Sequence, residues 1–165
     1  MDAPQVHLML NHLPVLGVLF SALVFGIGLL TRNTPISRLA IATLLAAALA
    51  GIPVFLSGEP AEEAIEHSAG VSERVIEVHE EAARVAIIAL EILGLAALAG
   101  LVLYRRSDVS RGFASILLVA TLALSGWMAW TAHLGGQIRH EELRGGAVAS
   151  QQASDAEEAE EEGDD

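Results

Sequence analysis

Four long apolar runs limit what this chain can fold into more than any other feature of its sequence. Each is close to the ~20 residues that a helix needs to cross the ~30 Å hydrocarbon core of a bilayer. Lipid offers no partner for backbone polar groups, so long runs without alternation predict helices. The runs are Leu13–Leu30, Leu39–Leu56, Val85–Tyr104 and Phe113–Leu134. The sequence therefore predicts an all-α fold, a four-helix transmembrane bundle.

Composition supports a membrane protein and excludes several other classes. Apolar residues make up 53% of the chain, and most are small or aliphatic, as in helices that pack closely in lipid. A soluble four-helix bundle would need a polar stripe on each helix, which the second and fourth runs lack. The absence of cysteine excludes disulfides, zinc-thiolate sites and iron–sulfur ligation by this chain. The net charge of −12 argues against nucleic acid as a partner.

The arginines predict how the bundle is oriented. Arg32 and Arg38 flank the connection after the first run, and Arg105, Arg106 and Arg111 flank the connection after the third. By the positive-inside rule both connections are cytoplasmic, so the two termini lie outside. The N-terminus lacks the positive leader of a signal peptide, so we expect the first run to be a retained span.

The long outer segment between the second and third runs is predicted to contain helices. Ser57 and Pro60 favour a helix start and Gly70 a stop, which predicts a short interfacial helix over about residues 60–68. Ser72 is then expected to cap a long helix that runs to about Arg105.

Residues 145–165 hold eight of the 21 acids and no basic residue, which predicts a disordered acidic tail. The chain thus divides into a transmembrane domain, residues 1–144, and this tail, residues 145–165.

All six histidines are predicted to lie at the outer end of the bundle, namely His7, His12, His67, His79, His133 and His140. At 100° per residue, His79 and His133 each lie at the outer end of a helical face made of small residues. Helices approach closely along such a face, or a flat cofactor fits there. His12 stands just before Pro14, which disturbs the local helix. We therefore expect His12, His79 and His133, from three helices, to converge.

Three interpretations of these histidines remain open from the sequence. Two neutral imidazoles on facing helices are the usual axial ligands of b-type haem in a bundle. The outer arginines, Arg74, Arg84, Arg139 and Arg144, would then pair with its propionates. Alternatively, Glu63 and His67, four residues apart, join the three histidines in a direct zinc, copper or iron site. In the third interpretation the histidines are interfacial hydrogen-bond partners and no cofactor is bound.

Glu91 is the one acid inside a predicted span. An intramembrane carboxylate is costly and by default indicates a function. It shares a helical face with other titratable side chains nearer the surface, which suggests a proton path or a contact with a quinone. The alternative is a neutral carboxyl group that is hydrogen bonded to Thr43 or Ser125.

Four segments carry a resemblance to known proteins: NHLPVLG from Asn11, SGEPAEEAIEH from Ser57, GVSERVIEVHEEAA from Gly70 and TAHLGGQIRH from Thr131. They resemble a group of small bacterial four-span membrane proteins of unknown function. The HLGG element is similar to one in a broader family, some of whose members are fused to Rieske-type redox domains. The resemblance covers about residues 1–144. It implies a bacterial inner (cytoplasmic) membrane location and an electron-transfer context. In that membrane the termini, which the arginines predict to lie outside, are periplasmic.

The sequence shows no nucleophile elbow, phosphate loop or dinucleotide fingerprint, so a stand-alone enzyme is not expected. The predicted function is a small redox or anchor protein that binds b-type haem near the periplasmic face and transfers electrons to a redox partner protein or a quinone. The alternative is a cofactor-free or metal-binding accessory or sensor protein whose acidic outer face binds a partner. The lipid bilayer is the one partner common to both, and a homo-oligomer is left open.

Overall fold

A computed structural model of the protein describes residues 3–65 and 71–140. These residues form helices and no strands, which confirms the all-α prediction. The helices are α1 (Ala3–Leu10), α2 (His12–Thr31), α3 (Thr34–Glu63), α4 (Glu73–Leu103) and α5 (Arg111–Arg139). The predicted acidic tail, residues 145–165, lies outside the described residues.

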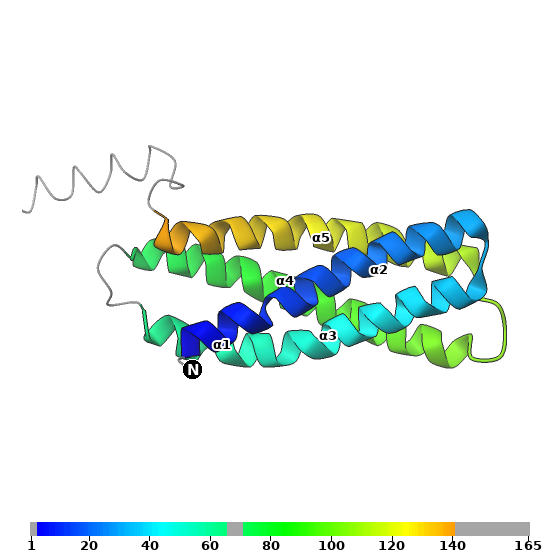
Figure 1. The fold of residues 1–165 in the computed structure, drawn as a ribbon, viewed down its shortest axis with the longest axis horizontal. Helices are drawn as coiled ribbons and strands as arrows, with labels where there is room; N and C mark the ends of the chain where they lie inside the picture. The colour runs from blue at the N-terminus through cyan, green and yellow to red at the C-terminus, as the bar shows by residue number, and fades with distance from the viewer. Residues whose placement is uncertain (1–2, 66–70, 141–165) are drawn as a thin grey trace, which may run out of the picture.

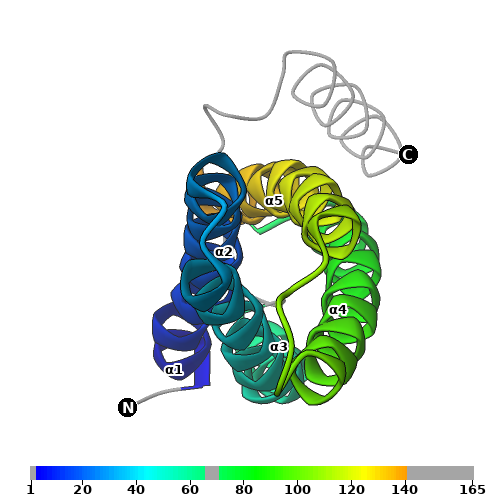
Figure 2. The ribbon, with the colours of Figure 1, turned by 90° about the vertical axis from the view of Figure 1, so that its right-hand side faces the viewer.

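Helices α2 to α5 form a closed, antiparallel bundle. Each packs against the next along the chain, and α5 returns to pack against α2, as the end-on view in Figure 2 shows. Four helical segments are long and apolar enough to cross a membrane, with α1 and α2 together forming the first. The predicted four-helix transmembrane bundle is confirmed, and the chain is a multi-pass membrane protein.

Small residues set the distances between the helices. A Cβ added at Gly17 of α2 would lie 2.9 Å from the Cβ of Ala47 on α3, and one added at Gly94 of α4 would clash with the Cβ of Ala48. Such close backbone approach is typical of helices that associate in lipid, where dispersion and not the hydrophobic effect drives packing. The surface away from the bundle interior carries many exposed large apolar side chains, which supports contact with lipid.

The two ends of the bundle differ in chemistry (Figure 1). At one end the α2–α3 and α4–α5 connections carry or adjoin a group of arginines, and we call it the arginine end: Arg32, Arg38, Arg105, Arg106 and Arg111. The other end holds the described histidines and is called the histidine end: His7, His12, His79, His133 and His140. An even number of crossings therefore gathers these histidines at one end, as expected.

The first helix begins earlier than the apolar run that predicted it. Pro14 has no backbone N–H, so the carbonyl of Leu10 lacks its usual donor, and the helix is interrupted at Asn11 between α1 and α2. The interruption lets α1 pack against the last turns of α3 at the histidine end (Figure 1). His7 is thereby placed on a helix and not on a free N-terminal segment.

The predicted interfacial helix does not begin at Pro60. Helix α3 continues through Pro60 to Glu63, and the Ser57 hydroxyl donates to the Val54 carbonyl of the same helix. Packing against α1 gives these turns a partner, and Ala61 is buried there. The rest of the predicted helix lies in residues 66–70, outside the described residues. Helix α4 does begin directly after Ser72, as predicted.

Candidate functional site

His79 on α4 is held against α5 by a hydrogen bond and by a glycine. Its Nδ1 lies 3.0 Å from the backbone carbonyl oxygen of Thr131. A carbonyl only accepts, so Nδ1 carries the hydrogen, and the neutral ring has its lone pair on Nε2. A Cβ added at Gly135 would lie 3.0 Å from His79 Cε1, so the glycine makes room for the half-buried ring.

His7 on α1 is held against α3 in the same way. Its Nδ1 lies 3.0 Å from the Ser57 hydroxyl oxygen. Because Ser57 donates its own hydrogen to the carbonyl of Val54 at 2.9 Å, its oxygen is left to accept from His7. His7 is therefore also the tautomer with hydrogen on Nδ1 and a lone pair on Nε2.

His7 and His79 form what we call the histidine pair. Both rings are half-buried, and both lie at the histidine end of the bundle. Histidines that bind metals commonly donate the second ring nitrogen to a carbonyl or another acceptor, which fixes the tautomer and the ring orientation. The pair has this arrangement on both members, from two different helices. Chemically it offers two oriented nitrogen ligands at one end of the bundle.

The other two predicted ligands are placed differently. His12 is exposed, and its Nδ1 bonds the Leu8 carbonyl oxygen at 2.7 Å. His133 is exposed too, and its Nε2 accepts from the Gln137 amide at 3.1 Å within α5. In the described part of the chain neither forms a hydrogen bond to His79. The sequence therefore predicts the end of the bundle at which His79 lies, but it does not single out His7.

The signal for His7 was present but weak. Its position four residues before Asn11 and seven before Pro14 is compatible with a helix that precedes the proline interruption. The packing of that helix on α3, which brings His7 to Ser57, depends on tertiary structure.

The remaining predicted ligands lie at the same end without forming a metal site. Arg74 and Arg84 are exposed on α4, Arg139 ends α5, and Glu63 is exposed at the end of α3. His67 and Arg144 lie outside the described residues. Among residues 3–65 and 71–140, no three His, Cys, Asp or Glu side chains are close enough to hold a metal ion. A direct metal site would thus need a ligand from elsewhere, such as His67.

Glu91 lies within the bundle wall, where α4 meets α3. Its Oε1 is buried without a hydrogen-bond partner, and it lies 3.4 Å from where a Cβ on Gly51 would be. The hydroxyl groups of Thr43 and Ser125 donate within their own helices, to the Leu39 carbonyl at 2.9 Å and to the Thr121 carbonyl at 2.8 Å. Among the described residues no hydrogen bond joins either hydroxyl group to Glu91, so the structure does not show the bond that the sequence suggested.

A second buried oxygen without a hydrogen-bond partner lies at about the same position along the bundle axis as Glu91 Oε1. Trp127 Nε1 donates to the Ala82 carbonyl at 3.0 Å, and Phe113 lies against Gly100, which fixes the antiparallel register of α4 and α5. This register puts Thr121 of α5 level with Glu91. The Thr121 hydroxyl oxygen is likewise buried and without a partner.

Comparison of the chain with protein-family models, with curated proteins and with solved structures gives no match. The resemblance to small four-span bacterial membrane proteins therefore stays a prediction.

Proposed function

We propose that this membrane protein binds b-type haem at its histidine end and transfers electrons, with His79 and His7 as the axial ligands. The observation that supports this proposal is the histidine pair. Both members donate from Nδ1 to an acceptor on a neighbouring helix, and both keep the Nε2 lone pair for a ligand.

The number of ligands favours haem over a directly bound metal ion. Structural and catalytic zinc sites take three or four protein ligands, and no group of three is present among the described residues. A porphyrin supplies four nitrogens of its own, so two imidazoles complete the iron. Haem would supply the one-electron chemistry, while the chain orients the ligand nitrogens and keeps them among packed helices. The exposed guanidinium groups of Arg74 and Arg84 suit the propionates, and α5 ends at Arg139 at the same end of the bundle.

We propose that the histidine end lies in the periplasm of a bacterial inner membrane. The five arginines of the arginine end support a cytoplasmic location for that end by the positive-inside rule. A redox protein or a quinone would then react on that side. Because the chain has no cysteine, single cysteines at Ser72 and Ser107 can be labelled with an impermeant reagent. Labelling of Ser107→Cys but not Ser72→Cys from outside intact cells would contradict this orientation.

Glu91 is proposed to handle protons that accompany electron transfer, because it supplies a buried, unpaired carboxylate oxygen inside the bundle. If so, the midpoint potential of the bound haem depends on pH in the wild type and depends less on pH in Glu91→Gln. An equal dependence in both proteins would remove Glu91 from this role.

The same two hydrogen bonds favour one alternative. They tie α1 to α3 and α4 to α5, so the histidines act as structural links without any cofactor. The chain would then be an accessory or sensor protein, whose exposed acidic face on α4 (Glu73, Glu77, Glu80 and Glu81) binds a partner or a cation.

A visible spectrum separates the two. We would express the full chain with haem supplied in excess, purify it in detergent, and record oxidised and reduced spectra. The expected result is a Soret band in the wild type that is lost in His79→Ala and His7→Ala and kept in the matched control His140→Ala. Helical circular dichroism checks that each variant is folded. If the Soret band is lost in His12→Ala or His133→Ala and kept in His7→Ala, the second axial ligand is His12 or His133 and not His7. A colourless wild type would refute the haem proposal and favour the alternative.

A further inference from the structure

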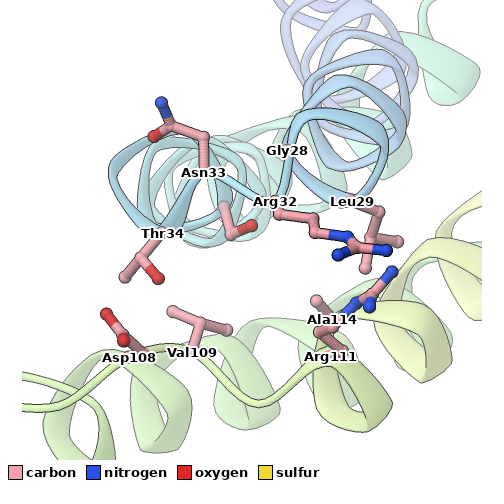
Figure 3. Close-up of a pocket in the computed structure, with 10 residues that line it drawn as sticks. Gly28, Leu29, Arg32, Asn33, Thr34, Asp108, Val109, Arg111 and Ala114 are labelled. Atoms are coloured by element: carbon pink, nitrogen blue, oxygen red, sulfur yellow. The ribbon is translucent and has the colours of Figure 1, made fainter.

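The arginine end contains a pocket that the proposed function does not use. It is open to one side and has a volume of about 210 Å³. Its walls come from the turn between α2 and α3 and from the residues at the start of α5, as the close-up in Figure 3 shows. The polar side chains that line it are Arg32, Asn33, Thr34, Ser37, Asp108 and Arg111.

The backbone at Arg32 is unusual. Arg32 has φ 54° and ψ 38°, the left-handed region, and is the only non-glycine residue with positive φ in the described part of the chain. Its N–H and that of Asn33 close the last turn of α2 on the Gly28 carbonyl, the place where glycine is the common residue. An arginine costs more than glycine here. This conformation carries the Arg32 side chain into the pocket.

Two arginine side chains line this pocket. Figure 3 shows the Arg32 and Arg111 side chains, from the end of α2 and the start of α5, pointing toward one another. Among the described residues neither has a hydrogen-bond or ion-pair partner. Asp108 also lines the pocket, but it lies beside Thr34, away from the guanidinium groups (Figure 3). Two cations held together repel unless an anion lies between them.

Two other polar side chains at this end form hydrogen bonds within the chain. Arg38 donates from Nη2 to the carbonyls of Tyr104 and Ser107 at 2.8 and 2.7 Å, so it closes the α4–α5 connection. Asn33 caps α3 by accepting from the Ile36 N–H. At α5, in contrast, the Ser110 side chain makes no capping bond, which leaves first-turn N–H groups beside Arg111 for an anion.

We propose that Arg32 and Arg111 bind a phosphate group between them. Guanidinium groups match phosphate oxygens through paired, charge-assisted hydrogen bonds, and the start of α5 adds N–H donors and a positive helix end. The site lies at the end of membrane-spanning helices, which is the level of lipid headgroups. The phosphodiester of an anionic lipid and a free phosphate ion share this chemistry, and the experiment below separates them.

The test uses the full chain and two probes. Inorganic phosphate is titrated against the protein in neutral detergent and followed by phosphorus NMR. Phosphatidylglycerol is added in increasing fraction to phosphatidylcholine bilayers that hold the protein, and the unfolding temperature is measured. The variants are Arg32→Gly, whose left-handed backbone suits glycine, and Arg111→Ala. Arg106→Ala is the matched control, because Arg106 is exposed at the same end and does not line the pocket.

Each lost guanidinium is expected to weaken binding by about tenfold or more, as for a charge-assisted hydrogen bond. If phosphatidylglycerol raises the unfolding temperature of the wild type and Arg106→Ala but not of Arg32→Gly or Arg111→Ala, the site holds a lipid phosphate. If inorganic phosphate alone separates these proteins, the site holds a soluble phosphate. If neither probe separates them, or if Arg106→Ala loses as much as the others, the proposal is wrong.

Discussion

The contact between Gly94 on α4 and Ala48 on α3 gives a direct test of how the bundle is packed. An added Cβ at Gly94 would overlap the Cβ of Ala48, which is attached to the backbone and cannot rotate away. Carbon atoms at optimal separation are ~3.5–4.0 Å apart, so Gly94→Ala must push the two helices apart. Overpacking of this kind costs about 1–3 kcal/mol. Alanine also favours a helix over glycine by up to about 1 kcal/mol, which offsets part of that cost.

We therefore expect Gly94→Ala to lower the free energy of unfolding by about 1–2 kcal/mol, measured by thermal or denaturant unfolding in detergent with circular dichroism. Gly126→Ala is the matched control. Gly126 lies in a membrane-spanning helix, and nothing lies within 4 Å of its added Cβ. The free energy of unfolding of Gly126→Ala should be unchanged or slightly higher than that of the wild type. Adding Ala48→Gly to Gly94→Ala should recover part of the loss. If Gly94→Ala is as stable as Gly126→Ala, the described α3–α4 packing is wrong.

Two further predictions concern the site residues. Ser57→Ala removes the acceptor for His7 Nδ1, so nitrogen NMR should show the His7 ring changing from the Nδ1–H tautomer to a mixture of tautomers. The control Ser125→Ala should leave the His7 tautomer unchanged. A wild-type His7 ring with its hydrogen on Nε2 would contradict the assignment. Glu91→Leu removes a buried oxygen without a partner beside Gly51, so it should raise the free energy of unfolding by about 1 kcal/mol or more; a loss of stability would mean that the carboxyl group has a partner.

The parts of the fold that lipid dictates could be predicted from sequence. A span needs enough consecutive apolar residues and internal backbone hydrogen bonds, and both requirements can be assessed along the chain. The bundle and the gathering of the described histidines at one of its ends follow from them. The helix ends could not be predicted in the same way. Pro60 suggests a new helix, yet α3 continues through it because α1 packs there, and that contact depends on the interruption near Pro14.

The site was predicted only as far as one helix can show it. His79 can be singled out from the sequence because its face on α4 is lined by small residues, a pattern within one segment. His7 cannot, because its contact with Ser57 joins residues 50 apart in the sequence. In the sequence Arg32 and Arg111 indicate only orientation, since their approach depends on how α2 and α5 are rotated about their axes. Convergence of side chains from separate helices is a tertiary property, and helical periodicity alone does not determine it.

The two ends of the bundle are held together by different means, and this makes the histidine site testable. At the arginine end, helices are joined by short connections, and Arg38 bonds two backbone carbonyls across them. At the histidine end, side-chain hydrogen bonds from His7, His79 and Trp127 link neighbouring helices. A lost neutral hydrogen bond costs about 0.5–1.5 kcal/mol, which is small beside the packing of four long helices. A histidine variant should therefore lose a bound cofactor while the bundle stays folded.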